Sequence, residues 1–293
     1  MEGTAKNWYD KSYKILLVIP IVLLFASLIY IGYFYNQNGD VIKRDSSLAG
    51  GTTITIQEDI SSDELESLLK EKINDVRVRE IRSVGGDSNL ALIIDSSVEP
   101  EILKTAVEEV IGYKLDDSNS STEFTGSSLS SSFYKQLIIA IIISFILMSL
   151  VIFFLFKTFV PSMAVIFAAF ADIVMSLAVV DYFGIELSAA GIAAFLMLIG
   201  YSVDTDILLT TRVLRKTEGS VNHRIYGAFK TGMFMNCTAL IAVLPAFFII
   251  TGLPDSFRQI FLILAIGLGA DMINTWLTNA SIIKWYADHK GIQ

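Results

Sequence analysis

Residues 195–216, FLMLIGYSVDTDILLTTRVLRK, decide the fold class of this chain. An apolar run over 192–203 begins as a membrane helix would, and Asp204 and Asp206 then follow at a depth that should still be hydrocarbon. The stretch ends with three basic residues: Arg212, Arg215 and Lys216. One charge near the centre of a bilayer costs roughly 2.5–3.5 kcal/mol. Two carboxylates on a helix that must still insert therefore need a structural or functional reason.

The rest of the chain is also apolar, since 53% of its 293 residues are hydrophobic. Several runs reach about 20 residues, the length that spans a bilayer, and the ten-residue alternation typical of membrane strands is absent. The sequence therefore predicts a polytopic α-helical membrane protein with six transmembrane helices. They are expected at residues 14–35, 133–156, 161–181, 188–211, 231–251 and 257–284.

One sizeable polar domain, residues 36–132, separates the first span from the other five. Alternating β-branched residues and capped amphipathic stretches predict four strands and two helices in the order β-α-β-β-α-β, which is the ferredoxin-like pattern. The strands are expected at 51–57, 76–83, 89–95 and 122–125, the helices at 61–73 and 100–113, and a serine-rich linker at 127–132. The domain carries 19 acidic and 9 basic residues. This balance argues against nucleic acid as its partner.

Basic residues indicate the orientation of the spans in the plasma membrane. Lysine and arginine gather in the N-terminal segment 1–13, at Lys157, in a predicted loop at 212–230 and in the C-terminal segment 285–293. With six spans these parts fall on one side, which the positive-inside rule assigns to the cytoplasm. We therefore expect both termini to be cytoplasmic, residues 36–132 to be extracytoplasmic, and residues 133–284 to form a five-helix bundle.

Polar residues inside the predicted bundle are the candidate functional groups: Asp172, Asp204, Asp206, Asp271 and Asn236, with Thr238, Asn274 and Thr275 nearby in the sequence. Buried carboxylates in a membrane can carry protons or cations. Hydrogen-bonded packing between helices is the alternative, and the number of costly carboxylates favours an ion path over it. Asp204 and Asp206 point roughly 200° apart on a helix. We expect Asp204 to face the path with Asp172, and Asp206 to lie at the interface.

Other chemistries find no support in the sequence. Cys237 is the one cysteine, and the two histidines, His223 and His289, have no metal-ligand spacing. Neither a phosphate-binding GxxxxGK[ST] loop nor a GxSxG elbow is present. The sequence thus predicts no enzyme, no cofactor and no metal site. Any work that the protein does would draw on an ion gradient or on a partner.

The arrangement of one helix, a ferredoxin-like outer domain and five further helices resembles the SecF family of the Sec protein-export machinery. Residues 196–215, LMLIGYSVDTDILLTTRVLR, resemble the GYS-(I/V)-N-D segment of that family, and Asp172 matches its acidic position on the third helix. Gly50 and Gly51, before a β-branched strand, resemble its outer-domain motif. The fifth and sixth helices look more like archaeal than bacterial versions.

The resemblance implies a SecD-like partner subunit, a SecYE-type channel, an unfolded exported chain as substrate and coupling to a proton gradient across the lipid bilayer. The family's acidic position falls on Thr205, between Asp204 and Asp206. Its arginine at the start of the fifth helix falls near Gly227. The basic partners of the carboxylates would then be sought among Arg212, Arg224 and Lys230.

Two other functions fit the same sequence. One is half of a resistance-nodulation-division transporter that moves lipids or small molecules, with a second chain supplying the missing helices. The other is a scaffold that steadies the channel without moving ions.

Overall fold

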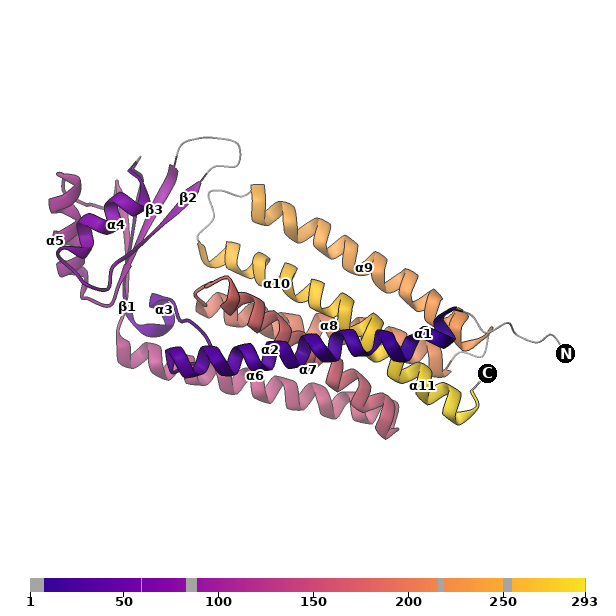
Figure 1. Cartoon of the computed structure of the whole chain (residues 1–293). Coiled ribbons are helices and arrows are strands. Elements are labelled where there is room, and N and C mark those ends of the chain that lie inside the picture. Colours follow the sequence, from indigo (N-terminus) through magenta and orange to yellow (C-terminus); the bar gives the residue numbers. More distant parts are fainter. Residues whose placement is uncertain (1–7, 59, 83–88, 216–218, 250–254, 293) are drawn as a thin grey trace.

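A computed structural model describes residues 8–58, 60–82, 89–215, 219–249 and 255–292. Lys216 of the opening stretch lies outside these ranges. An α/β domain lies at one end of a long helical bundle, and the first and last described helices lie together at the other end (Figure 1). Among the described residues, six helical segments are long and apolar enough to cross a membrane. The predicted fold class, a polytopic helical protein with one inserted α/β domain, is confirmed.

The bundle is built from long helices that pack side by side (Figure 1). The first span consists of α1 and α2, and the last consists of α10, a π-helix η1 and α11. The bounds are α1 Trp8–Leu16, α2 Val18–Asn38, α6 Ser127–Phe156, α7 Phe159–Tyr182, α8 Ala189–Arg215, α9 Val221–Ile249, α10 Asp255–Ile273, η1 Asn274–Asn279 and α11 Ala280–Lys290. Helices α7 and α8 are the most buried spans, so they form the centre of the bundle.

The α/β domain has the predicted β-α-β-β-α-β order, preceded by a short helix. Its elements are α3 Ser46–Ala49, β1 Gly51–Ile56, α4 Ser62–Lys70, β2 Arg77–Arg82, β3 Asn89–Ser96, α5 Pro100–Ile111 and β4 Ser120–Thr125. The sheet is antiparallel with strand order β2-β3-β1-β4. Ile54 pairs with Ile94 across β1 and β3, and both pack on Leu65 and Leu103 of the two helices. Alternation along the strands thus places one face of the sheet against α4 and α5.

Gly50 and Gly51 lie at the entry to β1. Both have positive φ angles, +85° and +147°, which L side chains rarely adopt. A Cβ on Gly51 would lie 2.3 Å from the backbone oxygen of Ser96 on β3. This position therefore requires glycine because the two strands approach closely there.

The α/β domain is joined to the bundle at the turn between α7 and α8. The Leu187 N–H donates to the Lys43 carbonyl at 2.7 Å, and the Asp45 N–H donates to the Leu187 carbonyl at 3.1 Å. Gln259 of α10 accepts hydrogen bonds from the backbone N–H of Ser188, at 2.8 Å, and from its hydroxyl, at 2.5 Å. The chain leaving α2, the α7–α8 turn and the start of α10 therefore form one connected layer under the domain.

Helix α9 begins at Val221, so the predicted loop at 212–230 is wrong for most of its length. Val221, Ile225 and Ala228 share one helix face and pack in a cluster with Leu209 and Val213 of α8. In the sequence these apolar residues are mixed with basic ones, and this hides the helical pattern. Packing against the neighbouring helices makes the segment helical.

Two further segments predicted to be irregular are also helical. The serine-rich linker 127–132 forms the first turns of α6, where Leu48 of α3 packs against Tyr134 and Leu137. The later part of the predicted tail 1–13 belongs to α1, which is held to α11 by an ion pair of 3.0 Å between Asp10 and Lys284. In both cases a neighbouring element stabilises a polar helix end that would be marginal alone.

Candidate functional site

Three carboxyl groups from three different helices meet in the centre of the bundle. Asp172 lies on α7, Asp206 on α8 and Asp271 on α10. All three side chains are fully buried, with 0% exposure. The Thr275 hydroxyl oxygen lies 3.0 Å from an oxygen of both Asp206 and Asp271. The three helices thus bring one carboxyl group each to the centre of the bundle, with Asp206 rather than the expected Asp204 supplied by α8.

Asp172 is held by a hydroxyl and an amide. Ser202 of α8 donates its hydroxyl to Asp172 Oδ2. Asn274 of η1 donates its amide to Asp172 Oδ1 at 2.7 Å. These two hydrogen bonds join α7 to α8 and to η1.

Asp271 is the central carboxyl group of the cluster. Asn236 of α9 donates its amide to Asp271 Oδ2 at 2.7 Å. The Thr205 hydroxyl oxygen lies 3.1 and 3.2 Å from the two Asp271 oxygens, and 2.8 Å from the Ser202 carbonyl oxygen. Thr275, one turn beyond Asp271, lies 3.0 Å from its Oδ1. Asp271 therefore connects α8, α9 and the last span.

Asp206 shares one of these partners. The Thr275 hydroxyl oxygen also lies 3.0 Å from Asp206 Oδ1, and the Asn279 amide donates to the same oxygen at 2.7 Å. Asn279 also lies 3.5 Å from the hydroxyl of Thr210. Asp206 Oδ2 is buried, and this oxygen of the carboxyl group has no hydrogen-bond partner among the described residues.

The π-helix η1 supplies three of the neutral side chains that contact these carboxyl groups: Asn274, Thr275 and Asn279. Asn274, Thr275, Thr278 and Asn279 of this segment are all buried. A π turn changes the direction of side chains relative to an α-helix, and such turns are frequent at functional sites. Here it places two asparagine amides on two different aspartates.

Basic side chains do not balance these carboxyl groups. Within the described ranges, no lysine or arginine forms an ion pair or hydrogen bond with Asp172, Asp206 or Asp271. The site therefore consists of acidic, amide and hydroxyl groups.

The basic partners suggested by the sequence lie elsewhere. Arg212 donates to the Gly227 carbonyl and, at 3.0 Å, to the Thr231 hydroxyl. Arg224 donates to the Val213 carbonyl at 3.0 Å, and Lys230 is exposed. Arg212 and Arg224 tie α8 to α9, so the prediction that they balance the carboxylates is wrong. The reason is position: α8 and α9 meet through these residues at the end of the bundle, beyond the buried carboxyl groups.

The prediction that Asp204 faces the interior and Asp206 the interface is also wrong. Asp204 is exposed, whereas Asp206 is fully buried. The geometry that separates the two was right, but it does not say which face is covered. Ser202, Asp206, Leu209 and Val213 recur at helical spacing on the buried face of α8, and this periodicity was the available signal.

Two members of the site were not singled out from sequence: Ser202 and Asn279. The periodicity of α8 could have found Ser202, because it shares the buried face with Asp206. Asn279 had no comparable signal, since its direction depends on the π turn. Thr238, expected to line the path, is exposed and donates to the Phe234 carbonyl of its own helix at 2.7 Å.

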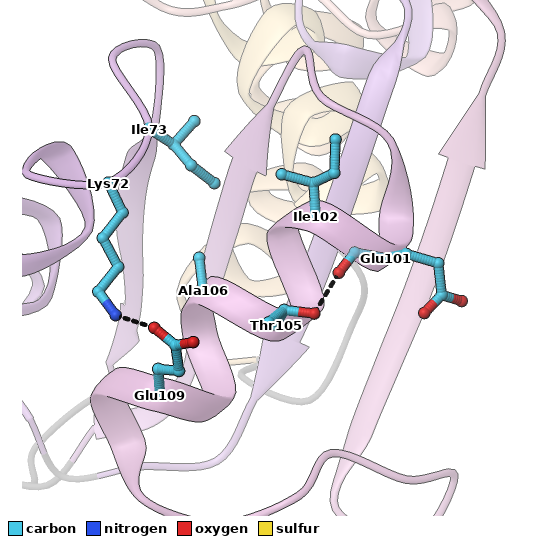
Figure 2. A pocket seen from close by; sticks show the side chains of 7 residues that line it. All are labelled: Lys72, Ile73, Glu101, Ile102, Thr105, Ala106 and Glu109. Atoms are coloured by element: carbon cyan, nitrogen blue, oxygen red, sulfur yellow. Dashed lines mark hydrogen bonds and ion pairs between the residues drawn. The ribbon is translucent and has the colours of Figure 1, made fainter.

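A second candidate site is an open groove on the α/β domain, with a volume of about 600 Å³ (Figure 2). Its floor includes Ile73, Ile102 and Ala106, and Ile102 is 54% exposed. At one side Lys72 forms an ion pair with Glu109. The groove therefore combines apolar area with charged groups at its side.

The comparisons with known proteins cover both parts of the chain. The family described as "Protein export membrane protein SecD/SecF, C-terminal" matches residues 103–289. The chain is 37% identical to the protein-export membrane protein SecF of Pyrococcus furiosus, over 93% of this chain and 90% of that one. This chain belongs to the SecF family of protein-export membrane proteins. The match to SecF of Methanocaldococcus jannaschii is also 37% identical, over 94% of this chain and 96% of the relative.

Among solved structures, the fold is similar to that of SecDF from Thermus thermophilus, described as a translocon-associated membrane protein. The TM-score is 0.75 at 16% identity, and the likeness covers 95% of this chain and 38% of that longer chain. The fold is therefore that of a SecF membrane protein. The three buried aspartates all lie within the region that matches the family.

Proposed function

We propose that this chain is an accessory subunit of the Sec export machinery that pairs with a SecD-like subunit and assists a SecYE-type channel. In this proposal a proton gradient drives the assistance, and Asp172, Asp271 and Asp206 carry the proton through the bundle. The family name supports the role in protein export. The partner, the channel and the coupling are inferred from the site and from the family.

The position of Thr275 between two carboxyl groups is the observation that carries the proposal. Its hydroxyl oxygen lies 3.0 Å from both Asp206 Oδ1 and Asp271 Oδ1. A hydroxyl has one hydrogen, so it cannot donate to two carboxylates at once. A proton on one carboxyl resolves this, because that group then donates to the Thr275 oxygen while Thr275 donates to the other. Exchanging the two roles moves a proton between α8 and the last span.

Further polar groups flank this pair in the bundle. Thr205 contacts Asp271 and the backbone carbonyl of Ser202, and the Ser202 hydroxyl donates to Asp172, so these two carboxyl groups are linked through two residues of α8. Chains of carboxyl and hydroxyl groups of this kind carry protons in membrane pumps and transporters. The absence of an ion-paired base from the described part of the site supports protons as the coupling ion, because a paired carboxylate would hold its charge.

The proposed orientation is supported by the ends of the bundle. Asp10 and Lys284 join α1 to α11, so the basic segments near both termini share one end. By the positive-inside rule this end would be cytoplasmic, and the α/β domain would then lie outside the cell membrane. The groove of Figure 2 would then face the exported chain.

The test compares two aspartates on the same helix. Asp206→Asn should reduce gradient-driven export to the rate measured without a gradient, whereas Asp204→Asn, two residues away and exposed, should leave it unchanged. The assay measures the rate of export in vesicles that contain the full chain, its SecD-like partner and the channel subunits. A pH gradient is imposed across the vesicle membrane. Co-purification of these partners from native membranes tests the assembly separately.

A scaffold without ion movement gives a different result. In that case Asp206→Asn and Asp271→Asn would both support gradient-driven export at the rate of the unmodified chain, provided that the assembly still forms. This outcome would leave the carboxyl groups with a packing role alone.

A further inference from the structure

A pocket of about 380 Å³ lies where the α/β domain meets the bundle. Three parts of the chain line it: Lys43 in the connection after α2, Arg77 and Arg79 on β2, and the α7–α8 turn together with Arg258 at the start of α10. The turn follows the end of one span at Tyr182 and precedes the next at Ala189, and the last span begins at Arg258. The pocket therefore lies at the level of the membrane surface, on the side of the α/β domain.

The charge of this pocket is unbalanced. Its lining includes four basic side chains, Lys43, Arg77, Arg79 and Arg258, and one acidic side chain, Glu186. Lys43 lies 3.2 Å from Glu186, and Arg77 contacts the same carboxylate. Arg79 pairs with Asp95 of β3 at 2.6 Å. Among the side chains that line the pocket, basic groups therefore outnumber acidic groups by four to one.

The cations also act on one another. Burial and the nearby guanidinium groups of Arg77 and Arg79 lower the pKa of Lys43. Holding these groups together is therefore unfavourable, and a bound anion would relieve the repulsion. Arginine in particular suits phosphate because its planar donors match two oxygens at once.

The pocket is accessible from outside. Lys43 and Arg77 are 39% and 48% exposed in their side chains. Phe183, which lines the pocket on the membrane side, is 68% exposed. Cationic groups on one side and an exposed ring on the other match a molecule with a charged head at a membrane surface.

We propose that this pocket binds a phosphate group through Lys43, Arg77, Arg79 and Arg258. The phosphate belongs either to a phospholipid headgroup or to a free phosphate anion. Bound there, it would bridge β2 to the start of α10 and fix the α/β domain to the membrane surface. The site lies at the outer end of the bundle, apart from the buried aspartates, and it does not depend on proton coupling.

Two arms of one experiment separate the sources. In the first, the full chain in phosphate-free, lipid-free detergent is titrated with inorganic phosphate, and its thermal unfolding is followed. In the second, the chain is placed in phosphatidylcholine nanodiscs that contain a small fraction of photoactivatable phosphatidylglycerol. Mass spectrometry then locates the crosslinks. A shift in the first arm alone identifies free phosphate, and crosslinks at residues 183–186 and 258–262 in the second identify a headgroup.

The variants are chosen so that a fold defect is not mistaken for lost binding. Arg258→Gln leaves both cations that contact Glu186 in place, whereas the double variant Lys43→Gln with Arg77→Gln removes them. Each should weaken binding about tenfold or more, which corresponds to about 1.4 kcal/mol. Lys114→Gln removes one positive charge from the same domain at an exposed position outside the pocket and should have no effect. Binding in neither arm, or an equal loss in Lys114→Gln, overturns the proposal.

Discussion

The side-chain amide of Asn279 donates to Asp206 Oδ1 at 2.7 Å, and this bond joins the π-helix η1 to the buried face of α8. Both side chains are fully buried. The carboxyl group depends on this donor and on Thr275, because water does not reach it. Helix α8 and the last span are therefore held together by the same groups that are proposed to move the proton.

Replacing Asn279 should destabilise the bundle. Asn279→Leu keeps a similar volume but leaves Asp206 without its amide donor, which costs about 1–3 kcal/mol for a buried acceptor. Thr238→Val is the control, because that hydroxyl is exposed and bonds only within its own helix. Denaturant unfolding in mixed micelles measures the free energy of unfolding of both variants. Equal stability of the two variants would mean that the bond contributes nothing.

Two glycines in the bundle should respond to alanine with opposite signs. A Cβ on Gly232 of α9 would lie 2.4 Å from Trp276 Cζ2, whereas one on Gly269 of α10 would meet nothing within 4 Å. Gly232→Ala should cost about 1–3 kcal/mol through overpacking. Gly269→Ala should raise stability by up to about 1 kcal/mol, because alanine favours helix. Thermal unfolding of both variants in the same detergent shows whether each substitution raises or lowers stability.

Gly232→Ala should displace α9 and thereby also disturb the buried carboxyl groups. Asn236 lies one turn further along the same helix and donates to Asp271. We expect gradient-driven export to fall in this variant and to stay unchanged in Gly269→Ala. Normal export by Gly232→Ala would show that the Asn236 contact is dispensable.

Gly51 should be irreplaceable in the α/β domain. Gly51→Ala combines a φ of +147° with a Cβ 2.3 Å from the Ser96 oxygen, and backbone strain of this kind costs about 1–3 kcal/mol before the clash is added. Gly126→Ala, at a position with open space and ordinary φ, should cost less, about 0.5–1 kcal/mol, because Gly126 is the N-cap of α6 and alanine is a poorer N-cap. Limited proteolysis of the full chain at increasing urea concentration measures the midpoint at which the α/β domain becomes cleavable. Similar cleavage midpoints for both variants would contradict the close approach.

The stability of the α/β domain should fall in acid. Burial alone would raise the pKa of Asp75, but hydrogen bonds from Ser97 and Ser96 outweigh it and lower that pKa. The two bonds are 2.9 Å from the Ser97 N–H and 3.0 Å from the Ser96 hydroxyl. A carboxyl with a lowered folded pKa stabilises the fold above its unfolded pKa of roughly 3.9, and this stability is lost as pH falls further.

The measurement is the unfolding free energy of the domain from pH 7 to pH 2. The unmodified chain should lose stability below about pH 4, and Asp75→Asn should show a shallower slope there because it has no proton to bind. Asp117→Asn removes an equal charge from an exposed position and should keep the original slope. A slope unchanged by Asp75→Asn would refute the role of these hydrogen bonds.

The sequence by itself determined the membrane fold and the order of elements in the α/β domain. These features depend on the length of apolar runs and on side-chain periodicity, both of which are written in neighbouring residues. The GYSVDTD segment and Asp172 also marked the right helices for the site.

The tertiary structure decided which aspartate of α8 is buried, where α9 begins and which neutral groups hold the carboxyls. Asp204 and Asp206 are chemically identical and lie two residues apart, so the packing of the neighbouring helices decides which one is buried, although the helical spacing of Ser202, Asp206 and Leu209 offered a signal. The segment from Val221 to Lys230 is helical because its apolar face packs on α8 and on the last span, the second of which is distant in sequence. The direction of Asn279 depends on a π turn, whose stability comes from the packing around it rather than from local sequence.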